Sequence, residues 1–111
     1  MASNSRSNYI NLGTTVTLKC YNMQKSTQIY VEPDEFTVDI EKNGVLIDTW
    51  VVDTDSEIQR VYDGEDFESY IIYVDTGTVF TTACTGVIKP KAVYYGSPDV
   101  SIVGKVTLTI T

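Results

Sequence analysis

The sequence predicts an all-β domain, a sandwich or a small barrel with seven to nine strands. Thr, Val, Ile and Tyr dominate the chain, and apolar residues alternate with polar ones at a period of two, which is typical of strands with one buried face. No window of about a dozen residues has the apolar spacing of an amphipathic helix. Turn residues recur at short intervals, as they do in sandwiches and barrels.

The alternation indicates where each strand begins and ends. Residues 14–21 form the first strong strand, because their apolar side chains share one face. Residues 36–41 alternate in the same way, and Asn43-Gly44 then favours the type I′ turn of a tight hairpin. The expected strands span residues 9–12, 14–21, 36–41, 45–53, 58–62, 67–74, 78–88 and 101–110.

Three of these strands have unusual features. Residues 67–74 are almost continuously apolar, which fits either a central strand covered on both faces or a strand whose outer face is used for binding. We expect the strand 78–88 to be straight or to break at Gly86, and the strand 101–110 to contain a bulge at Gly104.

Composition excludes several classes of function. The 111 residues include 15 acidic, 8 basic and no histidine residues, for a net charge of −7. This length supports one domain, and the charge argues against nucleic acid or an anionic membrane as the partner. Without histidine the commonest general base and metal ligand is missing, so we expect no enzyme and no cofactor. No apolar run approaches the roughly 20 residues that span a bilayer.

The first residues are polar and lack the apolar stretch of a signal peptide. We therefore expect a chain that stays in the cytosol where it is made, or is released by lysis, although a domain cut from a longer protein would begin in the same way. Residues 1–8 are expected to be a flexible arm, either a disordered tail or an arm that orders on a neighbouring subunit. Residues 9–111 form the domain.

The two cysteines allow a single intrachain pair. In a chain without a signal peptide we expect Cys20 and Cys84 to remain reduced, as small apolar side chains. They fit no zinc site, which needs four clustered ligands.

Several short motifs carry a resemblance to a known family. They are Gly13–Leu18, Phe36–Ile40, Lys42–Gly44 and Asp75–Thr78, and these resemble strands B, C and C′ and the corner before strand F of an immunoglobulin-like sandwich. Together with the order Pro-Asp-x-Phe-x-Val and the element Ile58–Gly64, the set is similar to small immunoglobulin-like proteins encoded among the structural genes of tailed bacteriophages. The resemblance covers residues 12–111 and implies an immunoglobulin-like β-sandwich with Greek-key connections.

The chain departs from the secreted immunoglobulin pattern at the corner before strand F. Val79 and Thr81 stand where that pattern has Tyr and Cys. If the strand keeps its alternation, Cys84 faces outward while Cys20 faces inward, so the two do not form a disulfide. A bulge in the strand could turn Cys84 inward and allow the pair. Trp50 lies in the return strand of the hairpin and not in strand C.

Acidic residues are concentrated in the middle of the chain. Residues 32–75 contain 14 of the 15 acidic residues and two basic ones, whereas the segments on either side are mildly basic. The middle segment supplies strands C to E, so we expect one edge or end of the sandwich to be strongly negative. This charge either protects strand edges and keeps the protein soluble, or orients the protein on a basic scaffold.

Two acidic groupings do not complete a site. Asp53, Asp55 and Glu57 have the spacing with which calcium loops begin, but the EF-hand pattern fails at its sixth and twelfth positions. Glu65 and Glu68 could be drawn as a glycosidase pair, yet nothing indicates a sugar-binding cleft. We expect no metal ligands and no catalytic residues.

The loop 89–98 is the best candidate for a partner contact. It corresponds to the F–G loop of the resembled fold and combines two lysines with two adjacent tyrosines, which offer contact area at low entropic cost. These tyrosines either cover the open end of the core or contact a capsid shell or host envelope, and the B–C loop 22–34 is expected at the same end. The candidate contact residues are Lys89, Lys91, Tyr94, Tyr95, Tyr30 and Arg6.

The resemblance implies a non-enzymatic structural protein of a phage virion, made in the host cytoplasm. Our first hypothesis is an auxiliary (decoration) protein on the capsid exterior that binds the major capsid protein, another virion protein or a host-surface glycan. A tail, neck or baseplate component is the nearest alternative. A binding module of a bacterial surface protein is the next, and a calcium-dependent lectin-like module is the last.

Overall fold

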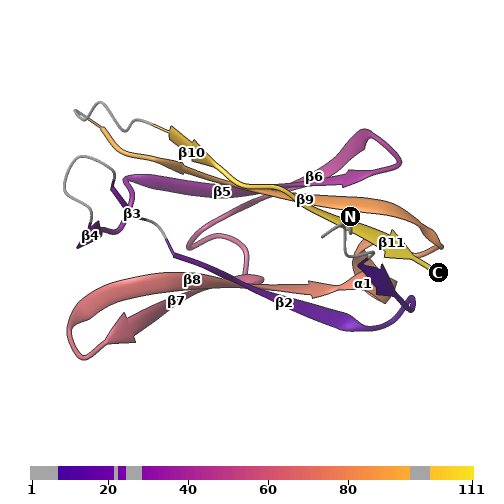
Figure 1. The fold of residues 1–111 in the computed structure, drawn as a ribbon, viewed down its shortest axis with the longest axis horizontal. Helices are drawn as coiled ribbons and strands as arrows, with labels where there is room; N and C mark the ends of the chain where they lie inside the picture. The colour runs from indigo at the N-terminus through magenta and orange to yellow at the C-terminus, as the bar shows by residue number, and fades with distance from the viewer. Residues whose placement is uncertain (1–7, 22, 25–28, 96–100) are drawn as a thin grey trace, which may run out of the picture.

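The computed structural model describes all residues except 1–7, 22, 25–28 and 96–100. For residues 23–24, 29–30 and 101–103 it describes the backbone alone. Two sheets pack face to face, and Figure 1 shows them as two layers with the short helix α1 at one end.

The larger sheet has the strand order β1-β11-β9-β5-β6, and β10 pairs with a further part of β9. Every pair is antiparallel except β1 with β11, which is parallel. Its strands are β1 (Tyr9–Ile10), β5 (Glu35–Lys42), β6 (Val45–Val51), β9 (Cys84–Val93), β10 (Ser101–Val103) and β11 (Val106–Ile110).

The smaller sheet has the order β2-β8-β7 and is antiparallel throughout. Its strands are β2 (Thr15–Cys20), β7 (Ile58–Asp63) and β8 (Asp66–Asp75), and a separate hairpin joins β3 (Met23–Gln24) to β4 (Ile29–Tyr30). The five strands on the path of the larger sheet and the three of the smaller one build an immunoglobulin-like sandwich of eight strands in the described part of the chain, with β10 as a further short strand beside β9. This confirms the expected fold class.

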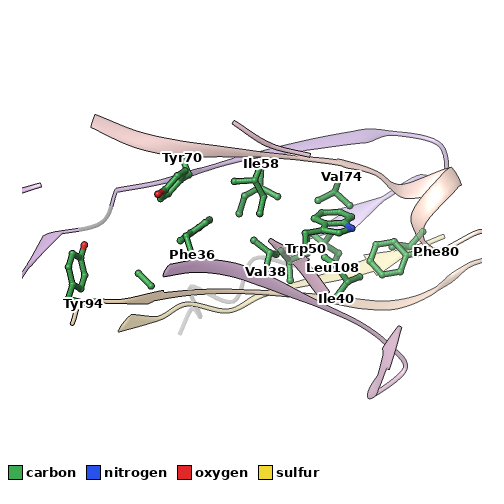
Figure 2. Packing of buried hydrophobic residues seen from close by; sticks show 14 residues of the cluster. Phe36, Val38, Ile40, Trp50, Ile58, Tyr70, Val74, Phe80, Tyr94 and Leu108 are labelled. Atoms are coloured by element: carbon green, nitrogen blue, oxygen red, sulfur yellow. The ribbon is translucent and has the colours of Figure 1, made fainter. Parts of the chain in front are cut away.

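The core forms where the inner faces of the sheets meet. Phe36 of β5 stacks on Tyr70 of β8, with ring centroids 4.1 Å apart and planes 16° from parallel. Phe80 and Tyr94 lie at opposite ends of the core cluster in Figure 2. Trp50 is also buried, and its indole nitrogen donates to Asp48 at 3.1 Å.

The hairpin at Asn43-Gly44 has the predicted turn. Both residues have positive φ angles, 50° and 83°, as a type I′ turn requires. The Asn43 amide donates to the Thr85 carbonyl, and its side-chain oxygen accepts from the Thr85 amide, both at 2.9 Å. These bonds fasten the hairpin to the start of β9.

The expected strand 78–88 is wrong in its first half. Residues Thr76–Val79 form the one-turn helix α1, and the Asp75 carboxylate caps it by accepting from the amides of Gly77 and Thr78. The buried Thr76 hydroxyl donates to the Thr14 carbonyl at 2.7 Å. A local cap thus competes successfully with the β propensity of this Thr-rich segment.

The helix also changes which way Cys84 faces. The period-two count carried through residues 78–83 pointed Cys84 outward, but it packs against the core at the start of β9. Cys20 also packs against the core but lies in the other sheet, opposite Tyr70. No disulfide joins the two cysteines, both of which the structure describes, as expected. Burial raises the pKa of the Cys20 thiol.

The structure decides the open question at Gly86 and corrects the expectation at Gly104. The pairing of β9 with β11 runs in unbroken register through Gly86, so β9 has no break there. At Gly104 the ladder is interrupted between β10 and β11, but the register is the same on both sides, so there is no bulge. The Gly104 amide still donates to the Pro90 carbonyl at 2.9 Å.

Strand β8 excludes one of the two interpretations of residues 67–74. It is the central strand of its sheet, and Tyr70, Ile72 and Val74 are buried on its inner face. Tyr73 is 37% exposed, so the strand is not covered on both faces.

Packing at Gly86 supplies a test of the core. A Cβ at this position would lie 2.7 Å from the Phe80 ring and 3.1 Å from the Ile110 side chain. Gly86→Ala should therefore lower the free energy of unfolding by about 1–3 kcal/mol through overpacking. Urea denaturation measures this, with the exposed neighbour Thr85→Ala as control, which should change it by less than about 1 kcal/mol. Equal effects of the two substitutions would contradict this packing.

Candidate interaction surface

Arg60 organises the acidic side of the sandwich. It lies in β7, and its Nε donates to the Glu32 carboxylate at 2.7 Å while the two terminal nitrogens bind the Asp53 carboxylate. The guanidinium carbon also lies 5.9 Å from the centre of the Tyr70 ring. Arg60 therefore connects the segment before β5, the segment after β6 and the central strand β8. Its hydrogen bonds to Asp53 also lower the pKa of that carboxyl.

Tyr70 is held in its neutral form by this environment. Burial raises its pKa, and the neighbouring Glu32 carboxylate raises it further, whereas Arg60 acts in the opposite direction. Its hydroxyl donates to Glu32 at 3.4 Å. Tyr70 is thus both a core residue and a member of the polar cluster.

Two carboxylates of the acidic turn after β6 are hydrogen-bonded to other groups of the protein. Asp53 has a positive φ of 71° and binds Arg60, and the Asp55 carboxylate accepts from the Val51 amide at 2.8 Å. Glu68, drawn in the sequence as one half of a glycosidase pair, instead binds Lys19 of β2 at 2.7 Å. In the described part of the chain, no three His, Cys, Asp or Glu side chains are placed to share a metal ion.

Tyr94 does not lie at the surface, which corrects its assignment as a contact candidate. It is 2% exposed, and its hydroxyl donates to the Val31 carbonyl at 2.8 Å. Tyr94 closes one end of the core against the segment that leads into β5. The covering role considered in the sequence analysis is therefore the correct one for this tyrosine.

Tyr95 differs from its neighbour, because it is 63% exposed. Its amide donates to the Asp34 carboxylate at 2.5 Å, and its hydroxyl donates to the Glu35 carboxylate. The ring is held at both its backbone and its tip, while most of its surface remains in solvent. Asp34 and Glu35 belong to the acidic middle segment of the sequence. They position Tyr95, which lies about 60 residues further along the chain.

The two candidate lysines belong to a strand. Because β9 continues to Val93, Lys89 and Lys91 lie on its outer face and not in the expected loop 89–98. Lys89 binds Glu41 of β5 at 2.6 Å, whereas Lys91 is exposed beside Thr37. Arg6 and the side chain of Tyr30, the other two candidates, lie outside the described residues.

Strand β6 has exposed apolar residues that were not predicted from the sequence. Val45, Leu46 and Ile47 are 64%, 55% and 42% exposed, and they follow the Asn43-Gly44 turn directly. The signal was present as three consecutive aliphatic residues beside a tight turn. Period-two reasoning assigns every second one to the core and so conceals such a surface.

Comparisons with known proteins concern the fold alone. No protein-family model matches the chain, and no curated protein shows significant similarity. The V domain of amphioxus IgVJ-C2 is similar in structure, with a TM-score of 0.40 and 10% identity over 93% of this chain and 96% of that one. The amphioxus IgVJ-C2 molecule has the same TM-score and 9% identity, over 93% of this chain and 53% of that one. In the part of the chain that the structure describes, no helix is long and apolar enough to cross a membrane.

The two tyrosines at the end of β9 should differ sharply in their effect on stability. Tyr94→Ala opens a cavity in the core and should lower the free energy of unfolding by about 3–5 kcal/mol. Tyr95→Ala removes an exposed ring and should lower it by less than about 1 kcal/mol. Denaturant unfolding of both variants measures the difference, and a similar loss for both would contradict the burial of Tyr94.

Tyr70 should make stability fall at alkaline pH. An unfolded tyrosine ionises at a pKa of about 10, whereas folding raises the pKa of Tyr70, so the unfolded state releases its proton first. The stabilisation is fully present below pH 10 and is lost as pH rises toward the raised pKa.

Urea unfolding between pH 8 and pH 11 tests this dependence, and Tyr70→Phe should make the decline shallower. Tyr73→Phe is the matched control on the outer face of the same strand and should leave the slope unchanged. A Tyr70→Phe slope equal to that of the parent chain would show that Tyr70 is not the group responsible.

Proposed function

We propose that this protein is a non-enzymatic attachment module, and specifically an immunoglobulin-like auxiliary (decoration) protein on the capsid exterior of a tailed phage. Its function would be to bind the major capsid protein or another virion protein through a preformed surface. The phage assignment is supported by the sequence motifs that resemble small immunoglobulin-like virion proteins, and the attachment role is supported by the surface at the end of β9.

The observation that carries the attachment role is the placement of Tyr95. A large aromatic side chain that is 63% exposed usually gains nothing from being fixed, yet Tyr95 is bonded at its amide and at its hydroxyl. A preordered tyrosine loses little conformational entropy on binding and offers both apolar area and a polar tip. Tyr95 and the exposed Lys91 would form the centre of the contact.

The charge distribution favours one orientation on such a particle. The acidic edge around Asp53 and Asp55 lies along β6 and β7, whereas Lys89 and Lys91 lie on the outer face of β9. In the proposed orientation the β9 end contacts the particle and the acidic edge faces solvent. Charge complementarity of this kind fixes orientation and speeds association more than it adds affinity.

Cosedimentation with particles of the encoding phage tests the proposal. Tyr95→Ala should weaken particle binding by about tenfold or more while the melting temperature stays within a few degrees. Tyr62→Ala is the matched control, because Tyr62 is 54% exposed but lies on β7, and it should bind like the parent chain. Cryo-electron microscopy of the particle would identify the site as capsid, neck or tail. Absence of the protein from purified particles would contradict the proposal.

A further inference from the structure

The hairpin turn contains the only asparagine of the chain that is followed by glycine, Asn43-Gly44. Both residues are exposed, and they lie between the end of β5 and the start of β6. Asparagine is a chemically labile residue, and a following glycine makes it more so, because no side chain hinders the approach of the next backbone nitrogen to the side-chain amide. The turn is therefore a candidate site of deamidation.

Deamidation at this position needs water alone. The Gly44 nitrogen attacks Cγ of Asn43, a bond forms between these atoms, and the bond from Cγ to the side-chain nitrogen breaks. That nitrogen leaves as ammonia with the proton of the Gly44 amide, and a five-membered succinimide ring remains. Water then opens the ring at one of its two carbonyl carbons. Opening at Cγ gives aspartate, whereas opening at the backbone carbonyl carbon gives isoaspartate, in which the main chain runs through Cβ and Cγ.

The side chain of Asn43 acts as a backbone acceptor in the larger sheet. The pairing of β5 with β9 ends at Lys42 opposite Gly86, so Asn43 and Thr85 stand opposite each other at the next position. An antiparallel pair of this kind exchanges two backbone hydrogen bonds. Here the Asn43 amide donates to the Thr85 carbonyl, but the Thr85 amide donates to the side-chain oxygen of Asn43, both at 2.9 Å. The group that deamidation alters therefore fastens the turn to β9.

The closed turn keeps the reacting atoms apart. Asn43 has a φ of 50°, and a type I′ turn holds the ψ angle of this residue at about 30°. That ψ directs the Gly44 nitrogen away from Cβ of Asn43, whereas ring closure requires the nitrogen on the Cβ side of the Cα–C bond. The hydrogen bond from Thr85 also holds the side chain toward β9. The reaction therefore proceeds from a state in which the turn has opened.

The end of the hairpin is built to open locally. The pairing of β5 with β6 shifts between Ile40 and Glu41, and this β-bulge separates the last two pairs from the rest of the hairpin. On the β6 side these pairs contain Val45 and Leu46, which are 64% and 55% exposed, in an edge strand of the sheet. Opening thus removes little apolar contact, and the start of β6 can separate while the remainder stays paired.

A second polar contact lies one residue before the turn. The Lys42 ammonium group donates to the Phe80 carbonyl at 2.7 Å, just after α1. This bond holds the end of β5 in place, so the two bonds between Asn43 and Thr85 are the ones that hold the turn itself. Their strength sets how often the turn opens.

We propose that Asn43 is a deamidation site whose rate is set by opening of the turn, and that its two products differ in whether the turn stays fastened to β9. Aspartate keeps a side-chain oxygen at the same position, so it still accepts from the Thr85 amide. Isoaspartate adds one carbon to the main chain, so the turn no longer fits both bonds to Thr85. This inference does not depend on the proposed attachment to a particle.

Peptide mapping by mass spectrometry, after incubation at one mildly alkaline pH, measures the rate at each asparagine. In the chain unfolded by guanidinium chloride, Asn43 should react faster than every other asparagine. In the folded chain it should react about tenfold or more slowly than in the unfolded chain. Asn11 is the internal control, because it is exposed but followed by Leu12, and it should react more slowly than Asn43 in the unfolded chain.

Thr85→Pro tests the fastening directly. It removes the amide that binds the Asn43 side chain and leaves Asn43-Gly44 unchanged, so the rate in the folded chain should rise about fivefold. Thr85→Ala is the matched control, because it keeps that amide, and it should leave the rate within about twofold of the parent chain. Thermal melting verifies that both variants fold. Should Thr85→Pro not fold, guanidinium concentrations below the unfolding transition serve instead, and they should accelerate the reaction in the parent chain.

The two products should differ in stability. Ion exchange separates them, labelling by an isoaspartate methyltransferase identifies isoaspartate, and the variant Asn43→Asp supplies the aspartate form. The aspartate form should melt within a few degrees of the parent chain, and the isoaspartate form should melt about 5 °C or more below it.

Three results would overturn the proposal. The first is an equal rate at Asn43 in the folded and unfolded chains, since the turn would then not control the reaction. The second is a folded-state rate that neither Thr85→Pro nor mild guanidinium raises, since the rate would then not depend on opening. The third is an isoaspartate form that melts with Asn43→Asp, since the fastening to Thr85 would then tolerate the longer main chain.

Discussion

The structure depends on packing between two sheets that no disulfide joins. Phe36 and Tyr70 form the central contact, since their stacked rings connect β5 of the larger sheet to β8 of the smaller one. A disulfide would restrict the unfolded chain, whereas this stack stabilises the folded state directly through burial and ring geometry. Stability of this sandwich therefore depends on the shape of its core, including the absence of a side chain at Gly86, where the Phe80 ring takes the space.

Tyr70 extends this constraint from the core to the surface. Its ring belongs to the core, and its hydroxyl reaches the cluster in which Arg60 binds Glu32 and Asp53. Arg60 holds the two loops that carry these carboxylates, and the residue that stacks on Phe36 contacts both Glu32 and Arg60. The acidic edge is thus a structured surface, and part of its charge is neutralised within the fold.

Most strands could be predicted from the sequence, because their information is local. Residues 14–21 and 36–41 alternate cleanly, and Asn43-Gly44 permits the positive φ angles of a tight turn. The prediction was wrong for residues 78–83, where the Asp75 cap and the buried Thr76 hydroxyl favour a helical turn over a strand. It was also wrong for residues 89–93 of the expected loop 89–98, since pairing with β5 extends β9 to Val93. The extension of β9 depends on a partner far along the chain, and the helical turn depends on Thr14 as well as on its local cap.

The sequence by itself determined the class of the fold and the hairpin turn, because alternation and turn chemistry act locally. Only the tertiary structure decided which of two adjacent tyrosines is exposed. The Tyr94 hydroxyl donates to the Val31 carbonyl at the end of the core, whereas Tyr95 donates to the Asp34 and Glu35 carboxylates at the surface. It also decided that Val45, Leu46 and Ile47 are all exposed, because the bulge and the edge position of β6 have no local signature. Surfaces are made by strands that meet from distant parts of the chain, so a local pattern does not specify them.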